Sequence, residues 1–155
     1  MTTRRQMISR SAQLAAMLAT LGLLPEVAQA QAAPYNTAAF DAKTMPELMK
    51  ALGAAAPMES KDITITGPDI AENGAVVPVG ASTALPGVKR MLLLVEKNPS
   101  MLSAMFDVTD AVDANFSTRV KMGQSSNVFA VALVADGKVL YAVKEIKVTL
   151  GGCGG

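Results

Sequence analysis

The sequence predicts an all-β protein, an immunoglobulin-like antiparallel β-sandwich with a short N-terminal helix and a flexible C-terminal arm. Three observations lead to this prediction. Short apolar and β-branched runs recur between residues 62 and 150, and turn-forming residues separate them. After residue 150, every residue except Cys153 is glycine. Several short strands at this spacing are typical of a two-sheet sandwich. A closed barrel is the alternative architecture.

Residues 1–30 have the features of a cleavable export signal. Arg4 and Arg5 precede the apolar run SAQLAAMLATLGLL, and small residues surround a cleavage site after Ala30. The apolar run is too short to span a bilayer. Consecutive arginines indicate the twin-arginine export route, and an ordinary signal that happens to contain two arginines is the alternative. We therefore expect a periplasmic protein with no membrane anchor, whose single domain occupies residues 31–150.

Residues 44–53 are predicted to form one short helix. Thr44 and Glu47 have the spacing of a capping box, and Pro46 lies in the first turn, where its missing N–H costs no hydrogen bond. Gly53 is a suitable end. The apolar side chains that would face the core are Leu48, Met49 and Leu52.

The remainder of the chain is predicted to form strands. Alternating or β-branched apolar segments indicate them, and Asp136-Gly137 predicts a tight hairpin turn. The segment GPDIAENG (67–74) is predicted to be a turn, and Pro78 suggests an edge strand or a bulge. The predicted strands are DITIT (62–66), AVVPV (75–79), VKRMLLLVEK (88–97), MLSAMFDV (101–108), NFSTRVKM (115–122), NVFAVALVA (127–135) and KVLYAVKEIKVTL (138–150).

The last predicted strand continues directly into a run of glycines. Past Leu150 no side chain except that of Cys153 remains to pack, and glycine loses the most backbone entropy on ordering. We therefore expect residues 151–155 to form a flexible arm that reaches about 15 Å when extended. Its glycines are Gly151, Gly152, Gly154 and Gly155. Within the strand, one buried face is expected from Val139, Tyr141, Val143 and, after a shift, Ile146, Val148 and Leu150.

The residue inventory excludes several classes of function. The chain has 14 Lys and Arg, 13 Asp and Glu, and no histidine. Without the signal, its net charge is about −1, which gives no electrostatic reason to bind nucleic acid or a membrane surface. It lacks the ligands of a zinc or iron–sulfur site and the base that a catalytic cysteine requires. We therefore expect a non-catalytic protein with no metal and no cofactor.

Three aspartates form the one pattern that resembles a cation site. Asp107, Asp110 and Asp113 are spaced along a predicted turn. The segment lacks the glycine and the bidentate glutamate of a calcium loop, so a solvated loop is the favoured interpretation.

Cys153 is the only cysteine, so it cannot form a disulfide within the chain. An exposed thiol on an arm can carry a small sulfur species as a persulfide or mixed disulfide and present it to successive enzymes. A cysteine without charged neighbours titrates near 8.5, so a partner's pocket would have to activate it. The alternatives are a structural sandwich that dimerises through Cys153, a cysteine without a role, and a ubiquitin-like carrier whose terminal Gly154-Gly155 forms a thiocarboxylate.

Three segments resemble a known family. The tail VTLGGCGG (148–155), IAENGAVVPV (70–79) and TRVKMG (118–123), with the twin-arginine signal, closely resemble SoxY, the sulfur-carrier family of the bacterial thiosulfate-oxidising Sox system. The resemblance covers essentially the whole mature chain. It implies that Cys153 is the covalent attachment site for sulfur intermediates, and that Gly151, Gly152, Gly154 and Gly155 form its arm.

The resemblance also implies partners. A SoxZ-like β-sandwich subunit would complete a heterodimer. The c-type cytochrome SoxAX would join thiosulfate to the cysteine, the manganese hydrolase SoxB would release sulfate, and in some organisms the molybdenum enzyme SoxCD would oxidise the remaining sulfane. Segments 70–79 and 118–123 are expected to be mostly core strands. Their side chains available for partner contact are Glu72, Asn73, Arg119 and Lys121.

Overall fold

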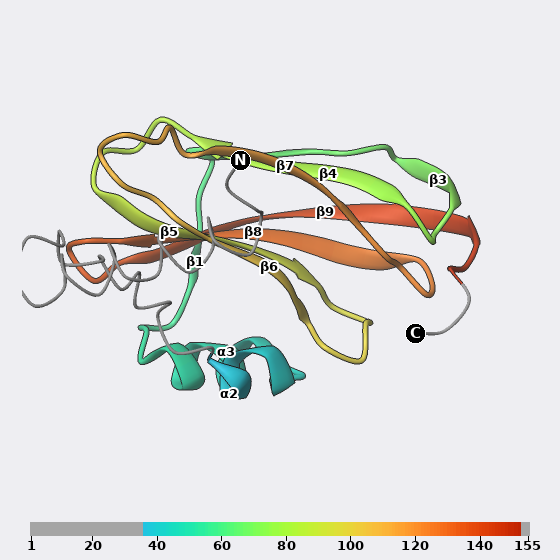
Figure 1. Cartoon of the computed structure of the whole chain (residues 1–155), viewed down its shortest axis with the longest axis horizontal. Coiled ribbons are helices and arrows are strands. Elements are labelled where there is room, and N and C mark those ends of the chain that lie inside the picture. The colour runs from blue at the N-terminus through green and yellow to red at the C-terminus, as the bar shows by residue number, and fades with distance from the viewer. Residues whose placement is uncertain (1–35, 153–155) are drawn as a thin grey trace, which may run out of the picture. The chain divides into compact units, whose positions relative to one another are not determined.

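The computed structural model describes residues 36–152, so the predicted export signal and the last three residues lie outside the described range. Within it, two sheets form a β-sandwich, and two short helices cover the outer face of the larger sheet (Figure 1). The predicted all-β sandwich is confirmed, and two sheets rather than a closed barrel enclose the core.

The larger sheet has the strand order β1-β9-β8-β5-β6, and β3 also pairs with β9. The smaller sheet has the order β2-β4-β7. The strands are β1 (Met58–Glu59), β2 (Ile63–Thr66), β3 (Ile70–Asn73), β4 (Val77–Thr83), β5 (Val88–Val95), β6 (Leu102–Asp107), β7 (Asn115–Val120), β8 (Ser126–Val134) and β9 (Val139–Leu150). Most pairs are antiparallel, as predicted, but β1 and β3 pair with β9 in parallel.

A core of apolar side chains fills the space between the sheets. Val77 and Val79 of the smaller sheet, and Met91, Leu93 and Ile146 of the larger one, are almost completely buried in it. Phe106 and Phe116 stack with ring centroids 4.4 Å apart and so join β6 to β7 across the two sheets. More and less buried residues alternate along β7, as the two-residue period of side-chain direction requires for a strand covered on one face.

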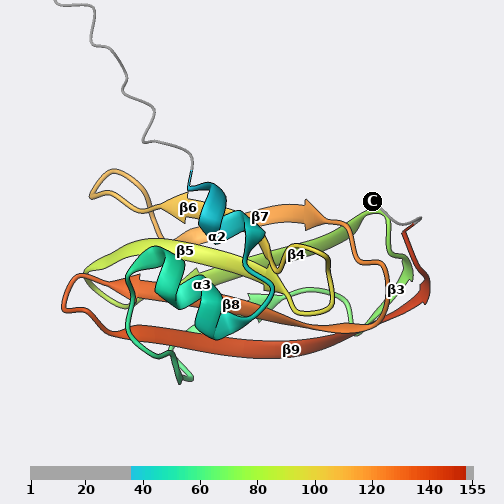
Figure 2. The same ribbon diagram turned by 90° about the horizontal axis from the view of Figure 1, so that it is seen from below.

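A second core lies between the larger sheet and the helices, α2 (Thr37–Asp41) and α3 (Met45–Leu52). Leu48 of α3 is fully buried there with Leu92 and Leu94 of β5. Figure 2 shows both helices lying across this face. Because β5 is covered on both faces, its MLLLV segment is continuously apolar rather than alternating.

The predicted helix at residues 44–53 is confirmed. The Thr44 side chain accepts a hydrogen bond from the Glu47 N–H, and Gly53 ends α3 in the left-handed region at φ 63°. The Glu47 carboxylate accepts from the Lys43 N–H at 3.0 Å, rather than from the Thr44 N–H of a standard capping box. Helix α2 was not predicted, because its single turn shows no apolar periodicity and only the Asn36 cap marks it.

The turn predicted for GPDIAENG is wrong at residues 70–73, which form β3; the strand expected in segment 70–79 is confirmed there, although its residues are mostly exposed rather than in the core. Ile70 pairs with Lys147 and Asn73 with Leu150, in parallel register. The segment shows little strand character because three of its four residues are exposed. Its partner is distant in the sequence, so no local pattern could reveal the pairing.

The predicted buried face of β9 is wrong at two positions. Val143 is 41% exposed and Leu150 is 67% exposed. Both faces of the strand are used without a register shift: Val139 belongs to the helix-side core, and Ile146 belongs to the core between the sheets. A strand covered on both faces does not need one continuous apolar side.

The predicted hairpin turn at Asp136-Gly137 is confirmed. The Val134 N–H donates to the Lys138 carbonyl at 2.9 Å, and Gly137 has a φ of 88°. Pro78 lies in β4, the middle strand of its sheet, but beyond the last residue of β4 that pairs with β2. On its β2 side, therefore, β4 pairs with no strand at Pro78, which agrees with the predicted edge position.

In the described part of the chain, neither helix is long and apolar enough to cross a membrane.

Candidate functional site

The predicted attachment residue Cys153 follows the last described residue directly. Cys153, Gly154 and Gly155 lie outside the described range, whereas Gly151 and Gly152 lie inside it. The structure therefore defines the base from which the cysteine continues, and the site is built from that base.

Strand β3 holds the end of β9 in place. The two strands pair in parallel, and the Gly74 N–H donates to the Leu150 carbonyl at 2.8 Å. The Val148 N–H donates to the Ser125 hydroxyl at 2.9 Å, so the loop after β7 also contacts this strand. The end of β9 is thus bonded on two sides.

Three backbone hydrogen bonds then join segments that are far apart in the sequence. Besides the bond from Gly74 to Leu150, the Met122 N–H donates to the Gly74 carbonyl at 2.7 Å, and the Gly152 N–H donates to the Met122 carbonyl at 3.1 Å. We call this arrangement of Gly74, Met122, Leu150 and Gly152 the junction. In Figure 1 the ends of β3, β7 and β9 meet at one end of the sandwich.

Glycine is required in the junction by close approach of the backbones. A Cβ atom on Gly74 would lie 2.2 Å from the Met122 carbonyl oxygen, and one on Gly152 would lie 2.8 Å from the Cα of Ala75. A Cβ on Gly151 would lie 2.3 Å from the Gly123 carbonyl oxygen. Such contacts are far shorter than van der Waals separations, so a larger residue at any of these positions would force the adjoining backbones apart.

The structure differs here from the predicted arm. Gly152 is buried and Gly151 is half-buried, so these two residues pack against the sandwich instead of extending from residue 151. The physical reason is that the missing side chains allow close packing, which offsets the entropy cost of ordering glycine. Gly154 and Gly155, with Cys153, stay a prediction because they lie outside the described residues.

A surface depression of about 530 Å³ adjoins the junction. Gly152 and Gly123 line it, together with the exposed side chains of Lys97, Lys121 and Gln124. Neither lysine forms an ion pair with another residue of the described range. The depression therefore has a positive charge and lies directly beside the residue that precedes Cys153.

Comparison with known proteins identifies the family. The sequence model of the family described as "Sulfur oxidation protein SoxY" matches residues 48–153, a range that includes Cys153 and ends on it.

The chain belongs to the SoxY family.

A solved structure supports this assignment. The sulfur carrier protein SoxY from Chlorobium limicola f thiosulfatophilum is similar to this chain with 35% identity and a TM-score of 0.63, over 70% of this chain and 97% of that one. A superoxide reductase (neelaredoxin) from Ignicoccus hospitalis is similar with 18% identity and a TM-score of 0.50, over 56% of this chain and 79% of that one, which shows the fold alone. No curated protein matches the chain.

The junction unites the three segments on which the resemblance to SoxY depends. Segment 70–79 contributes Gly74, segment 118–123 contributes Met122, and the tail contributes Leu150 and Gly152. Sequence reasoning interpreted the first two segments as core strands or partner surface and did not find this contact. The sequence signal that could have revealed this contact is glycine, because each of the two segments contains one and the tail is also rich in glycine.

Four side chains were predicted to be available for partner contact, and all four are exposed. They are Glu72, Asn73, Arg119 and Lys121. The Asn73 side chain also accepts a hydrogen bond from the Ala75 N–H at 2.9 Å, which shapes the turn into β4. Their contact with a partner stays a prediction.

An ion pair fixes the start of β3. The Lys144 Nζ atom lies 2.8 Å from the Asp69 Oδ1 atom, and the Lys147 N–H donates to the Asp69 carbonyl at 3.0 Å. The hydrogen bond from Lys144 and its positive charge lower the pKa of Asp69 below its ordinary value of 3.8. This exposed ion pair therefore adds a contact between the start of β3 and β9 that is present above the acidic range.

Among the described residues, no group of three or more Asp, Glu, His or Cys side chains could hold a metal ion. Of the three aspartates that resembled a cation site, Asp107 forms an ion pair with Arg90 at 2.6 Å. Asp110 and Asp113 line a different depression, which the loop between β4 and β5 and the loop before β7 form together.

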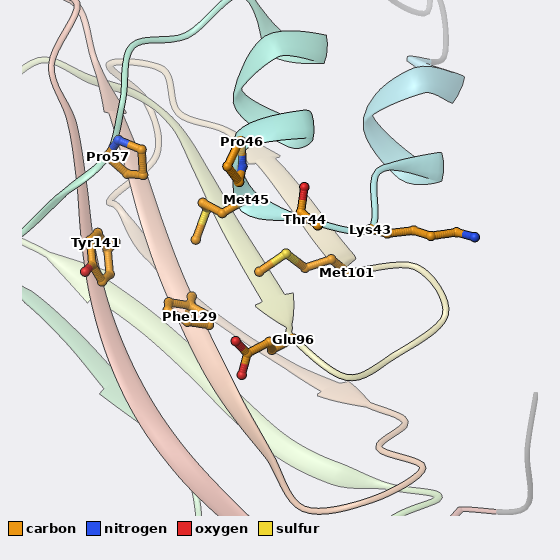
Figure 3. Close-up of a pocket in the computed structure, with 9 residues that line it drawn as sticks. All are labelled: Lys43, Thr44, Met45, Pro46, Pro57, Glu96, Met101, Phe129 and Tyr141. Carbon is orange, nitrogen blue, oxygen red and sulfur yellow. The ribbon is translucent and has the colours of Figure 1, made fainter.

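A further hollow of about 400 Å³ lies beneath the start of α3 (Figure 3). The rings of Phe129 and Tyr141, whose centroids are 5.8 Å apart, and the side chains of Met45 and Met101 form its apolar part. No described residue after Tyr141 lines it. It is therefore separate from the junction.

Proposed function

We propose that this chain is a periplasmic sulfur carrier that holds thiosulfate-derived intermediates covalently on Cys153 and presents them to the enzymes of thiosulfate oxidation. The observation that carries the proposal is the junction, which anchors Gly152 directly before the only cysteine of the chain. The similar SoxY structure from Chlorobium limicola f thiosulfatophilum is that of a sulfur carrier protein, which supports the same role here.

The chain's own contribution is a thiol that directly follows a packed base. The cores on both faces of the larger sheet make that body stiff, and β3 and the loop after β7 fix the end of β9. Only the residues after Gly152 would then have to enter a partner's active site. The sequence contains no histidine and one cysteine, so acid–base and redox steps are assigned to the partners.

The proposed cycle has balanced steps. In the first, the Cys153 thiolate and thiosulfate lose two electrons to a cytochrome partner such as SoxAX, and a sulfur–sulfur bond forms. Water then attacks the terminal sulfonate sulfur in a hydrolase such as SoxB, sulfate and two protons leave, and a persulfide remains on Cys153. Where SoxCD is present, the outer sulfur of the persulfide would lose six electrons to that enzyme, take up three oxygen atoms from three water molecules with release of six protons, and become a sulfonate.

A SoxZ-like subunit is the proposed permanent partner. Several apolar side chains are exposed on the described surface. Met58 and Val143 lie beside the part of the β9 edge, between β1 and β3, that pairs with no described strand. Ile70 and Leu150 lie at the end of β9. Exposed apolar residues along a sheet edge are suited to a protein interface. The export proposal follows from this heterodimer, because the twin-arginine route would carry a folded pair across the membrane together.

The test is the intact mass of the exported chain from cells that are oxidising thiosulfate. We expect masses that correspond to sulfur-containing adducts, which disappear after mild reduction and are absent from Cys153→Ser. Deletion of Gly155 should leave loading intact, whereas a thiocarboxylate carrier would lose it. Only disulfide-linked dimers, with no small adduct, would instead support a structural role for Cys153.

The same sample tests the export proposal. An N-terminus at Gln31 would agree with cleavage after Ala30. Replacing Arg4 and Arg5 by lysine should retain the uncleaved chain in the cytoplasm, and unchanged export of that variant would contradict the twin-arginine route.

A further inference from the structure

We propose that the depression beside the junction is a docking site for the anionic end of the carrier's own cargo, formed chiefly by Lys97 and Lys121. This inference rests on the proposed function, because it requires a charged adduct on Cys153. It adds a binding site on the body of the chain, where the S-thiosulfonate or S-sulfonate group rests between visits to partner enzymes.

Charge is the first argument. The lining residues of the depression include Lys97 and Lys121 and no carboxylate. An adjoining depression of about 330 Å³ shares Lys121 and adds Arg119, again with no carboxylate. The ion pairs of the described residues involve Arg90, Lys138 and Lys144, so none of the three cations at this site is neutralised by a described partner.

Hydrogen bonds fix the backbone positions of both lysines. The Lys97 N–H donates to the buried Ser126 hydroxyl at 3.1 Å. The Asn98 side-chain amide donates to the Lys121 carbonyl at 2.7 Å, which ties the loop after β5 to the end of β7. The backbones of two lysines on separate segments are thus fixed beside one depression, so only their side chains have to become ordered when a ligand binds.

The third argument is connectivity. Gly152 lines the same depression, and its N–H is bonded to the Met122 carbonyl. Consecutive Cα atoms are about 3.8 Å apart, so an adduct carried by the next residue in the chain would have only a short distance to cover from Gly152 to the lysines of the depression. A sulfonate group on the Cys153 sulfur has three oxygen acceptors, for which lysine ammonium groups are suitable charge-assisted donors.

The site can be tested on a chemically loaded chain. Tetrathionate reacts with the Cys153 thiolate at a central sulfur atom: a sulfur–sulfur bond breaks, an S-thiosulfonate remains on the chain and thiosulfate leaves with the electron pair. Methyl methanethiosulfonate installs a neutral methyl disulfide in the same way, with methanesulfinate as the leaving group. The two adducts differ in charge and are attached to the same sulfur.

We expect the S-thiosulfonate to shift the NMR signals of the Lys97 and Lys121 ε-methylene groups and of the Gln124 amide, and the methyl disulfide to leave them in place. The shift of the Gln124 amide should fall to less than half in the double variant Lys97→Gln, Lys121→Gln. It should stay unchanged in the matched control Lys61→Gln, Lys89→Gln, which removes the same charge from exposed positions outside the depression. Added salt should weaken it in the unmodified chain.

Three results would overturn the inference. Equal shifts with both adducts would mean that charge is not recognised. An equal loss in the two double variants would mean that only net charge matters. Equally strong shifts from free thiosulfate, added at the concentration of the protein to the methyl-blocked chain, would show a general anion site rather than a cargo site. Because loading is chemical, these outcomes are independent of whether cells load Cys153, which the intact-mass experiment decides.

Discussion

Gly74→Ala is the sharpest test of the junction, because it adds one methyl group where three segments meet. The new Cβ would lie 2.2 Å from the Met122 carbonyl oxygen, 2.8 Å from the Gly152 nitrogen and 2.8 Å from a methyl carbon of Val148. Two of these contacts are with backbone atoms, which cannot rotate away as the end of a side chain can. The backbone of Gly74 has a negative φ, so the substitution itself introduces no conformational strain.

The expected cost has two parts. Inserting a methyl group into close-packed surroundings costs about 1–3 kcal/mol. Relief of the overlap requires Met122 and Gly152 to separate from Gly74, which breaks at least one of the three junction hydrogen bonds. Each such bond contributes about 0.5–1.5 kcal/mol net. We therefore expect the free energy of unfolding to fall by about 2–4 kcal/mol, a large part of the stability of a small domain.

Chemical denaturation measures this loss, and hydrogen exchange locates it. The Gly152 amide should lose its protection in Gly74→Ala, whereas amides of β5 and β8 should keep most of theirs. Gly123→Ala is the matched control, because a Cβ at Gly123 meets no atom within 4 Å although the residue lies beside the same depression. Its free energy of unfolding should be unchanged or slightly higher.

The reasoning would be refuted if Gly74→Ala were as stable as the unmodified chain, within about 0.5 kcal/mol. It would also fail if Gly123→Ala lost as much stability, because the effect would then not depend on the close approach at Gly74. Protection of the Gly152 amide in Gly74→Ala would argue that the junction persists without glycine.

Three further predictions concern the parts that support the junction. Leu48→Ala should lower the free energy of unfolding by about 2–5 kcal/mol, since the Leu48 side chain of α3 is fully buried against the larger sheet, whereas Met58→Ala at a 55% exposed position should have little effect in the same denaturation experiment. Gly152→Ala should leave the unfolding transition nearly intact but raise hydrogen exchange at residues 150–152, because its Cβ would lie 2.8 Å from Ala75 backbone atoms. Asp69→Asn should make stability less sensitive to acid: Lys144 lowers the pKa of Asp69 below 3.8, so the ion pair stabilises the fold above that value and its contribution disappears as pH falls through the lowered pKa.

Each of these predictions has a contradicting result. Equal losses in Leu48→Ala and Met58→Ala would mean that α3 does not close a core. Unchanged exchange at the end of β9 in Gly152→Ala would remove the case for a packed base. Parallel stability curves for Asp69→Asn and the unmodified chain between about pH 6 and pH 2 would show that the pair with Lys144 does not stabilise the fold.

Local sequence patterns predicted the elements whose signals are contained in a few neighbouring residues. The cap at Thr44 and the stop at Gly53 define α3, and Asp136-Gly137 defines the hairpin between β8 and β9. The alternating and β-branched runs located most strands, because the side-chain period of a strand is visible in a short segment. The role of Cys153, the single cysteine among glycines, stays a prediction.

Long-range pairing escaped the same reasoning. Strand β3 looked like a turn because its residues are mostly exposed and its parallel partner is β9, at the other end of the chain. The exposure of Val143 and Leu150 depends on which faces the helices and the second sheet cover. Such coverage is a property of the packed layers and has no local signature.

The sequence by itself determined the class of fold, the positions of α3 and most strands, and the residue that can carry sulfur, since these depend on local propensity and on which chemical groups are present. Only the tertiary structure decided that Gly74, Met122 and Gly152 meet, and that Lys97 and Lys121 lie on one depression beside them. The reason is physical. Backbone atoms of distant segments approach closely only where side chains are absent, and which segment lies against each glycine depends on how the sheets pack.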